Sequence, residues 1–226
     1  MRIKISFKPS MVKHSGSIHH YVNGMIHKLL GSNNKYHNNF STYAVSSLQG
    51  GKLINGGIVF NNGAYLYISF PDSTSFYNDI MMGLLTSDKT FAGDLEFDNK
   101  IDECDFKPHK SYDIVRTISP ILLKNDNGET ITFKDDDFIR IITEKSKKKL
   151  IKNGISVEKA DSIELIPFHF ENGKLKYVKV KNVVNVSSQV MFLVKGDIQA
   201  RYMLYCLGLG KSTGSGFGSV EIISKN

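Results

Sequence analysis

Hydrophobic and polar residues alternate at the start of the chain, and this pattern then gives way to a longer period. Over Arg2–Lys8 every second residue is apolar, which is typical of a strand with one buried face. Ser15 or Ser17 can then cap a helix that ends at about Leu30, before Gly31. The apolar face of this predicted helix has helical spacing and comprises Ile18, Val22, Met25, Ile26 and Leu29.

The rest of the first half continues with strand patterns and one more helix. Strands are predicted at Phe40–Leu48, Gly57–Phe60, Ala64–Phe70 and Leu95–Cys104. Asn61-Asn62-Gly63 is typical of a hairpin turn. A helix is predicted from Ser73 or Ser75 to about Leu85. The resulting order, β-α-β-β-α-β, is that of a ferredoxin-like fold.

The second half repeats the alternating theme without a convincing sequence repeat. A helix is predicted from the acidic cluster Asp135–Asp137 to about Asn153, and another from Gly196 or Asp197 to about Leu207. Strands are predicted at Tyr112–Ser119, Ile121–Leu123, Thr130–Phe133, Ser162–Phe170, Lys174–Val186, Gln189–Val194 and Ser219–Ile223. We therefore predict an α+β protein of two tandem ferredoxin-like (RRM-like) domains, residues 1–110 and 111–226, with a glycine-rich loop at 208–218.

Composition excludes several classes of protein. No apolar run reaches the ~18–20 residues that a membrane span requires, and the N-terminus is an alternating strand rather than a signal peptide. Cys104 and Cys206 are isolated, which supports neither a disulfide framework nor a cysteine-type zinc site. We expect a cytoplasmic protein with no membrane association, no metal and no cofactor.

The formal net charge of +7 is unevenly distributed. Residues 1–71 contain seven Lys and Arg and no acid, whereas residues 72–115 have a net charge of −6 and residues 116–226 a net charge of +6. Chance in a segment rich in Asn and Ser is one explanation. We favour the other, in which the acid-free segment faces a polyanion.

The glycine-rich segment Gly208–Gly218 narrows the choice of partner. Gly210-Lys211-Ser212 resembles the end of a P-loop, but the earlier glycine that a P-loop requires is replaced by Tyr205. The segment does not match the dinucleotide-binding motif either, because the glycine required at position 213 is replaced by Thr213. The remaining pattern is Gly208-Leu209-Gly210, five residues, and Gly216-Phe217-Gly218, between a helix and the last strand. This pattern resembles the signature of the CRISPR-associated repeat-processing endoribonucleases of the RAMP superfamily. The first helix, the strand start at Phe40–Tyr43, the stretch Ile118–Ile121 and the chain length also fit, so the likeness spans almost the whole chain.

The resemblance implies two ferredoxin-like domains and metal-independent cleavage of CRISPR repeat RNA. In that reaction the ribose 2′-hydroxyl attacks the adjacent phosphate and leaves a 2′,3′-cyclic phosphate and a 5′-hydroxyl. The family usually places a catalytic His in or after the first helix, often helped by Tyr or Lys. It also implies that the glycine-rich loop contacts the RNA backbone near the cleavage site, which makes Gly208, Gly210, Lys211, Ser212, Gly216 and Gly218 candidate RNA-binding residues.

Histidines suit the two proton transfers of such a reaction because their unperturbed pKa lies near neutral pH. Five of the seven His lie within residues 14–37, inside the acid-free segment. We predict His27, off the apolar face of the first helix, and His37, in the loop after it, as the catalytic pair, without assigning base and acid. His20 is held in reserve, and Tyr36 beside His37 could help in catalysis or simply pack.

Lysines are the candidate phosphate partners. Lys35 and Lys52 are predicted to contact RNA near the site, and Lys211 from within the glycine-rich loop. A further tract ends the helix predicted before Asn153, either as a solvated helix end or as an RNA-backbone patch; it comprises Lys145, Lys147, Lys148, Lys149 and Lys152.

The predicted partner is precursor CRISPR repeat RNA, with a homodimer or a CRISPR effector complex as further assemblies. Two other functions stay open at this point. The chain could be a non-catalytic RNA-binding RAMP subunit of an effector complex, or a ferredoxin-like enzyme that acts on a small molecule. The cluster of histidines favours the endoribonuclease.

Overall fold

Strand β1 (Arg2–Phe7) occupies the middle of the larger sheet. Its side chains alternate between the two faces, which places Ile3, Ile5 and Phe7 on a buried face. It pairs antiparallel with β6 (Ala64–Ser69) on one side and β8 (Leu95–Cys104) on the other. The computed structural model describes residues 1–14, 18–31, 36, 42–71, 74–86, 90–91, 95–104, 107–180 and 182–223.

The elements from β1 to β8 form the N-terminal module. Its five-stranded sheet has the order β3-β6-β1-β8-β7, and within it β8-β1-β6-β3 is the ferredoxin-like order. Two helices pack their apolar faces on the cluster that includes Ile3, Leu66 and Ile68. The bounds are α1 (Ile18–Leu30), β3 (Ala44–Val45), β6 (Ala64–Ser69), α2 (Thr74–Thr86), β7 (Thr90–Phe91) and β8 (Leu95–Cys104). A smaller sheet of three strands flanks them, formed by β2 (Ser10–His14), β4 (Lys52–Ile54) and β5 (Gly57–Phe60).

The elements from β9 to β16 form the C-terminal module. Its four-stranded sheet has the order β12-β15-β9-β16, which is the same ferredoxin-like arrangement. Its strands and helices are β9 (Tyr112–Thr117), α3 (Phe138–Lys152), α4 (Val157–Asp161), β12 (Glu164–Phe168), β15 (Met191–Lys195), α5 (Ile198–Leu207) and β16 (Val220–Ile222). Two hairpins accompany the sheet: β10 (Leu123–Lys124) with β11 (Thr130–Ile131), and β13 (Lys174–Val180) with β14 (Val183–Gln189). Two short 3₁₀ turns, η1 (Phe170–Asn172) and η2 (Thr213–Ser215), complete the elements.

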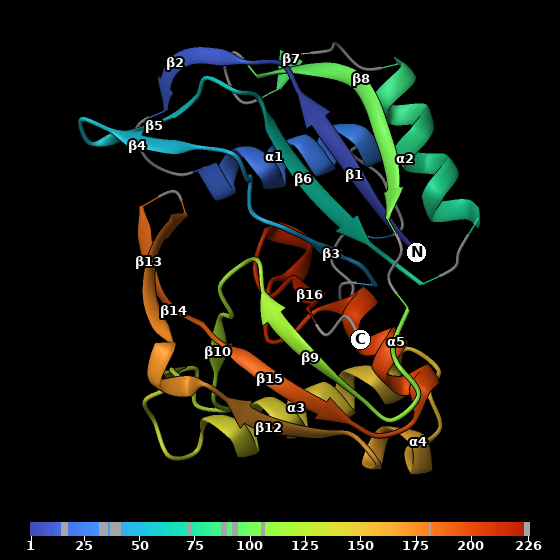
Figure 1. Cartoon of the computed structure of the whole chain (residues 1–226). Helices are drawn as coiled ribbons and strands as arrows, with labels where there is room; N and C mark the ends of the chain where they lie inside the picture. Colours follow the sequence, from blue (N-terminus) through green and yellow to red (C-terminus); the bar gives the residue numbers. More distant parts are fainter. Residues whose placement is uncertain are drawn as a thin grey trace.

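The two modules are joined by buried polar contacts as well as by the chain. The Arg2 guanidinium donates to Ser69 Oγ at 2.8 Å within its own module and to the carbonyl oxygen of Val220 in the other. Burial lowers the pKa of Arg2 to about 10. Nearby, the amide of Ser47 donates to Ser119 Oγ at 2.6 Å. Figure 1 shows the resulting arrangement, with α5 of one module next to β3 of the other.

The predicted α+β class and the tandem ferredoxin-like fold are confirmed, while several local predictions are corrected. The predicted strand Lys174–Val186 is wrong, because β13 and β14 form a hairpin within it. The segment lacks the Gly or Pro that marks most turns, so its pattern reads as one strand. The first turn of α3 is also different: Asp137 makes no side-chain cap, and Asp135 accepts from the Thr132 amide and hydroxyl instead.

Other predictions were incomplete or lie outside the described residues. The short strands β2 and β4 and the helix α4 were not predicted. The cap residues Ser15 and Ser17 lie outside the described residues, and the domain boundary near residue 110 stays a prediction. Within the part of the chain that the structure describes, no helix has both the length and the apolar character needed to cross a membrane.

Candidate functional site

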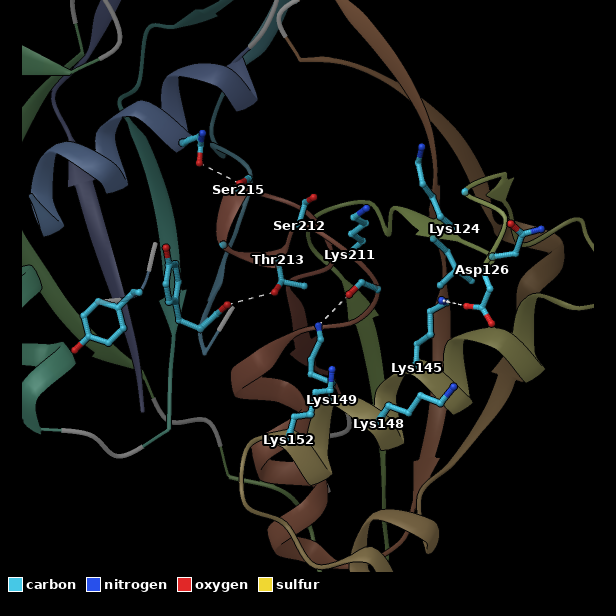
Figure 2. A pocket seen from close by; sticks show the side chains of 18 of the residues that line it. Lys124, Asp126, Lys145, Lys148, Lys149, Lys152, Lys211, Ser212, Thr213 and Ser215 are labelled. Atoms are coloured by element: carbon cyan, nitrogen blue, oxygen red, sulfur yellow. Dashed lines mark hydrogen bonds and ion pairs between the residues drawn. The ribbon is translucent and has the colours of Figure 1, made fainter. Parts of the chain in front are cut away.

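A cavity of about 870 Å³ lies between the two modules. Its walls are α1 and residues close after it on one side, and α3, the β10–β11 turn and the glycine-rich loop on the other (Figure 2). The lining residues are Asn23, His27, Tyr36, Tyr43, Leu123, Lys124, Asn125, Asp126, Gly128, Lys145, Lys148, Lys149, Lys152, Gly210, Lys211, Ser212, Thr213, Gly214 and Ser215.

The glycine-rich loop, Gly208–Gly218, has a backbone path that side chains would obstruct. Asp197 caps helix α5, because its carboxylate accepts from the amides of Gln199 and Ala200, and the helix ends at Leu207. Gly208 then turns the chain with φ +70°. At the far end of the loop Gly218 has φ +62°, and a Cβ there would lie 1.8 Å from the carbonyl oxygen of Leu209. The glycines therefore set the shape of the loop.

Backbone hydrogen bonds close the base of the loop. The amide of Leu209 donates to the carbonyl of Gly218 at 2.9 Å, and the amide of Lys211 donates to that of Leu122 at 2.8 Å. Leu209 and Phe217 are both buried. The hydrophobic positions of the two Gly-hydrophobic-Gly elements thus anchor the loop in the protein, while its middle faces the cavity.

The N-terminal module holds the middle of the loop. Thr213 Oγ1 donates to the carbonyl oxygen of Tyr43 at 3.3 Å, and Ser215 Oγ donates to Asn23 Oδ1 at 3.0 Å. The ring of His19 lies 4.9 Å from that of Phe217, centroid to centroid. Burial lowers the pKa of His19 to about 4, so the ring is neutral at neutral pH. The loop belongs to the second module but is bound to both.

His27 lies in the last turn of α1 and lines the cavity, half-buried. The structure thus brings it to the same cavity as Gly210, Lys211 and Ser212. Gly208, Gly216 and Gly218 do not line the cavity; their positive φ angles set the course of the loop backbone.

The other candidates from the N-terminal module fall in three places. His37 and Lys35 lie outside the described residues. Lys52 is exposed on β4 and is not among the residues that line the cavity. Tyr36 lines it and donates from its hydroxyl to Asp79 Oδ2 at 3.1 Å, whereas His20 is exposed outside it.

The lysine tract of α3 divides between two faces. Lys147 points towards α4 and donates to the carbonyl of Asp161 at 2.8 Å. The other four lysines line the cavity, where Figure 2 shows them beside Lys124 and Lys211. Among the described residues that line the cavity, one carries a carboxylate. It is Asp126, which pairs with Lys145 at 2.9 Å. Hydrogen bonding to Lys145 lowers the pKa of Asp126, so this carboxylate is ionised at neutral pH. It offsets one of the six lysines that line the cavity, which leaves the wall with an excess of basic side chains.

Lys149 differs from its neighbours because its ammonium is turned under the loop. It donates to the carbonyl oxygens of Gly208 and Gly210 at 3.0 and 2.9 Å. Burial lowers the pKa of Lys149 to about 7. The sequence places this lysine in the tract but gives no sign of its separate role. Asn23 and Tyr43 were likewise not predicted, since one is a polar position on a helix and the other contributes a backbone oxygen.

Within the described ranges, no group of three or more His, Cys, Asp or Glu side chains lies close enough together to hold a metal ion. The polar groups that line the cavity are those of six lysines, His27, Asp126, two asparagines, several hydroxyls and the loop backbone.

Comparison with known proteins agrees with this geometry. The family model "CRISPR associated protein Cas6, C-terminal" matches residues 102–222, more than half of the chain. The chain belongs to the Cas6 family. Proteins of this family are known for CRISPR repeat processing, and the family resemblance seen in the sequence is confirmed. No curated protein matches the chain by sequence.

Solved structures of Cas6 and RAMP proteins share the whole fold. A CRISPR-associated protein Cas6 is 23% identical, with a TM-score of 0.79 and 99% of each chain covered. The product of a Cas6-related gene from Pyrococcus furiosus is 20% identical, with a TM-score of 0.84 over 100% of this chain and 99% of that one. A RAMP protein described as binding different RNA substrates is 19% identical, with a TM-score of 0.80 over 99% of this chain and 100% of that one.

Proposed function

We propose that this Cas6-family protein is an endoribonuclease that cleaves CRISPR repeat RNA without a metal ion. The observation that carries the proposal is the cavity itself, which brings His27, the glycine-rich loop and a wall of lysines to one place. The products would be a 2′,3′-cyclic phosphate and a 5′-hydroxyl, as the family resemblance implies.

RNA binding is supported by the charge of the cavity wall. Lys124, Lys148 and Lys211 line a cavity with a single described carboxylate, and that carboxylate is already paired. Phosphate groups bound there would displace counterions, so affinity would fall as salt rises. Helix α1, in the acid-free N-terminal segment, carries no carboxylate that would repel the bound RNA.

Cleavage requires a base for the 2′-hydroxyl, an acid for the leaving 5′-oxygen and a cation for the phosphorane. We assign the two proton transfers to His27 and His37, in an order that we leave open. Lys211 supplies positive charge beside the glycine-rich loop, and the loop backbone and Ser212 hold the phosphate. Lys35 is proposed as a further RNA contact after α1, and Lys52 as a contact for RNA that extends over the smaller sheet.

The proposal is tested with end-labelled repeat RNA in excess EDTA. We expect one cleavage product whose 3′ end carries a cyclic phosphate, which acid opens to a monophosphate and which resists direct polyadenylation. Cleavage that stops in EDTA and returns with a divalent cation would overturn the metal-independent mechanism. Tight binding by folded protein with no cleavage would instead identify a non-catalytic RNA-binding subunit.

A further inference from the structure

The ammonium of Lys149 lies at the C-terminal end of α5, beneath the glycine-rich loop. It donates to three carbonyl oxygens, those of Leu207 at 3.5 Å, Gly208 at 3.0 Å and Gly210 at 2.9 Å. The last carbonyls of a helix have no partner within the helix, and they form the negative end of its dipole. Leu207 is fully buried, so a cation from a neighbouring helix supplies what water cannot.

The amides of the same segment are also occupied. Those of Leu209 and Lys211 donate to the carbonyls of Gly218 and Leu122. The segment from Leu207 to Lys211 is therefore fixed on both of its sides, by backbone groups on one and by Lys149 on the other. The direction in which this segment leaves α5 sets where Ser212 and Thr213 stand over the cavity.

We propose that Lys149 is a positioning residue for RNA binding, which holds the start of the glycine-rich loop so that its middle faces the RNA. This inference rests on the proposed function. Its ammonium is engaged by carbonyl oxygens, so it acts through the loop rather than on a phosphate. The other lysines of the cavity wall are the direct phosphate contacts.

The environment of Lys149 also makes this contact sensitive to pH. The groups that face the same cavity are Lys145, Lys148 and Lys152 on its own helix, Lys211 on the loop, Lys124 and Asp126 at the β10–β11 turn, Asn23 and His27 on α1, and Tyr36 and Tyr43. Burial lowers the pKa of Lys149 to about 7. Bound RNA would raise this pKa because a polyanion favours the ammonium. RNA affinity should therefore decline as pH rises through neutrality and above it.

The experiment compares Lys149→Met with Lys147→Met. Lys147 is a matched control, since it stands on the same helix and donates to one backbone carbonyl, but faces α4. The first measurement uses no RNA: hydrogen–deuterium exchange should become faster in residues 207–218 of Lys149→Met and stay unchanged in Lys147→Met. The second is the affinity for repeat RNA across neutral and mildly alkaline pH. Below neutral pH, Lys149→Met should bind repeat RNA about tenfold more weakly than the parent protein, as expected for loss of a charge-assisted contact. Its affinity should not decline further as the pH rises through neutrality.

Lys149→Arg extends the test if the Met variant does not fold. Arg stays charged throughout this pH range, so its RNA affinity should not decline above neutrality. Equal exchange and equal affinity of Lys149→Met and the parent protein at every pH would overturn the inference, as would a parent-like decline in Lys149→Arg. If the parent protein itself bound no repeat RNA, the proposed function would fail, while the exchange measurement would still decide whether Lys149 holds the loop.

Discussion

The hydroxyl of Ser215 donates to Asn23 Oδ1 at 3.0 Å, and this bond ties the glycine-rich loop of the C-terminal module to the first helix of the N-terminal module. His27 stands one helical turn after Asn23 on α1. The bond therefore fixes the loop relative to the helix that carries the leading catalytic candidate.

A double-mutant cycle of Asn23→Ala and Ser215→Ala should measure this connection. A hydrogen bond between neutral groups contributes about 0.5–1.5 kcal/mol net, and residues in contact are non-additive. We expect a coupling free energy of that size in urea unfolding, and a lower cleavage rate in each single variant. Strict additivity of the two substitutions would show that the bond does not hold the modules in solution.

His27→Ala should lower the single-turnover cleavage rate about 10²–10⁴-fold, the usual contribution of a general acid or base. Its affinity for repeat RNA should change little, because the lysine wall remains. His37→Ala should behave in the same way. His169→Ala is the control, since that exposed ring pairs with Glu171 outside the cavity. Parental rates in both His27→Ala and His37→Ala would move the chemistry to other residues.

Gly218→Ala should strongly destabilise the protein. Its φ of +62° disfavours a side chain, and the new Cβ would meet the Leu209 carbonyl oxygen, a backbone atom that cannot move without opening the loop. We expect a loss of at least about 3 kcal/mol in the free energy of unfolding, from strain and overpacking together. Gly24→Ala is the matched control, because a Cβ there meets nothing within 4 Å on α1. That change should stabilise the helix by about 0.5–1 kcal/mol.

His19 should make stability depend on pH in the acid range. Burial lowers its pKa to about 4 in the folded protein, against about 6.5 in an unfolded chain. The stabilising effect of the neutral ring is complete above pH ~6.5, and it is lost as the pH falls towards 4, by roughly 2–3 kcal/mol. Urea unfolding of the parent and His19→Leu at pH values across this window checks the prediction. The two proteins should differ in slope, while exposed His20→Gln should follow the parent; identical slopes for His19→Leu and the parent would contradict it.

The order of the helices and strands could be predicted from the sequence, because it depends on periodicity and turn residues. The alternation in β1, the apolar face of α1 and the cap at Asp197 each act within a few residues of chain. The break between β13 and β14 was missed because the residues on either side of it, Lys176–Val180 and Val183–Val186, are all exposed or half-buried, so their side chains give no change of pattern at the turn.

The candidate site could be predicted only in part from the sequence, for a different reason. His27 and the glycine-rich loop carry their own local signals, and the structure brings both to one cavity. The role of Lys149 depends on three carbonyls that lie about 60 residues further along the chain, and that of Tyr43 on a backbone oxygen. Contacts of this kind have no signature in composition or spacing.

The bond from Thr213 to the carbonyl oxygen of Tyr43 has a consequence for how such proteins can diverge. Every residue has a backbone carbonyl oxygen, whatever its side chain. At this point the loop therefore constrains the path of the N-terminal backbone and not the identity of residue 43. This bond therefore tolerates substitution of residue 43 wherever that path is kept. The glycine-rich loop has no such freedom, because its positive φ angles and close backbone approaches select the residues themselves.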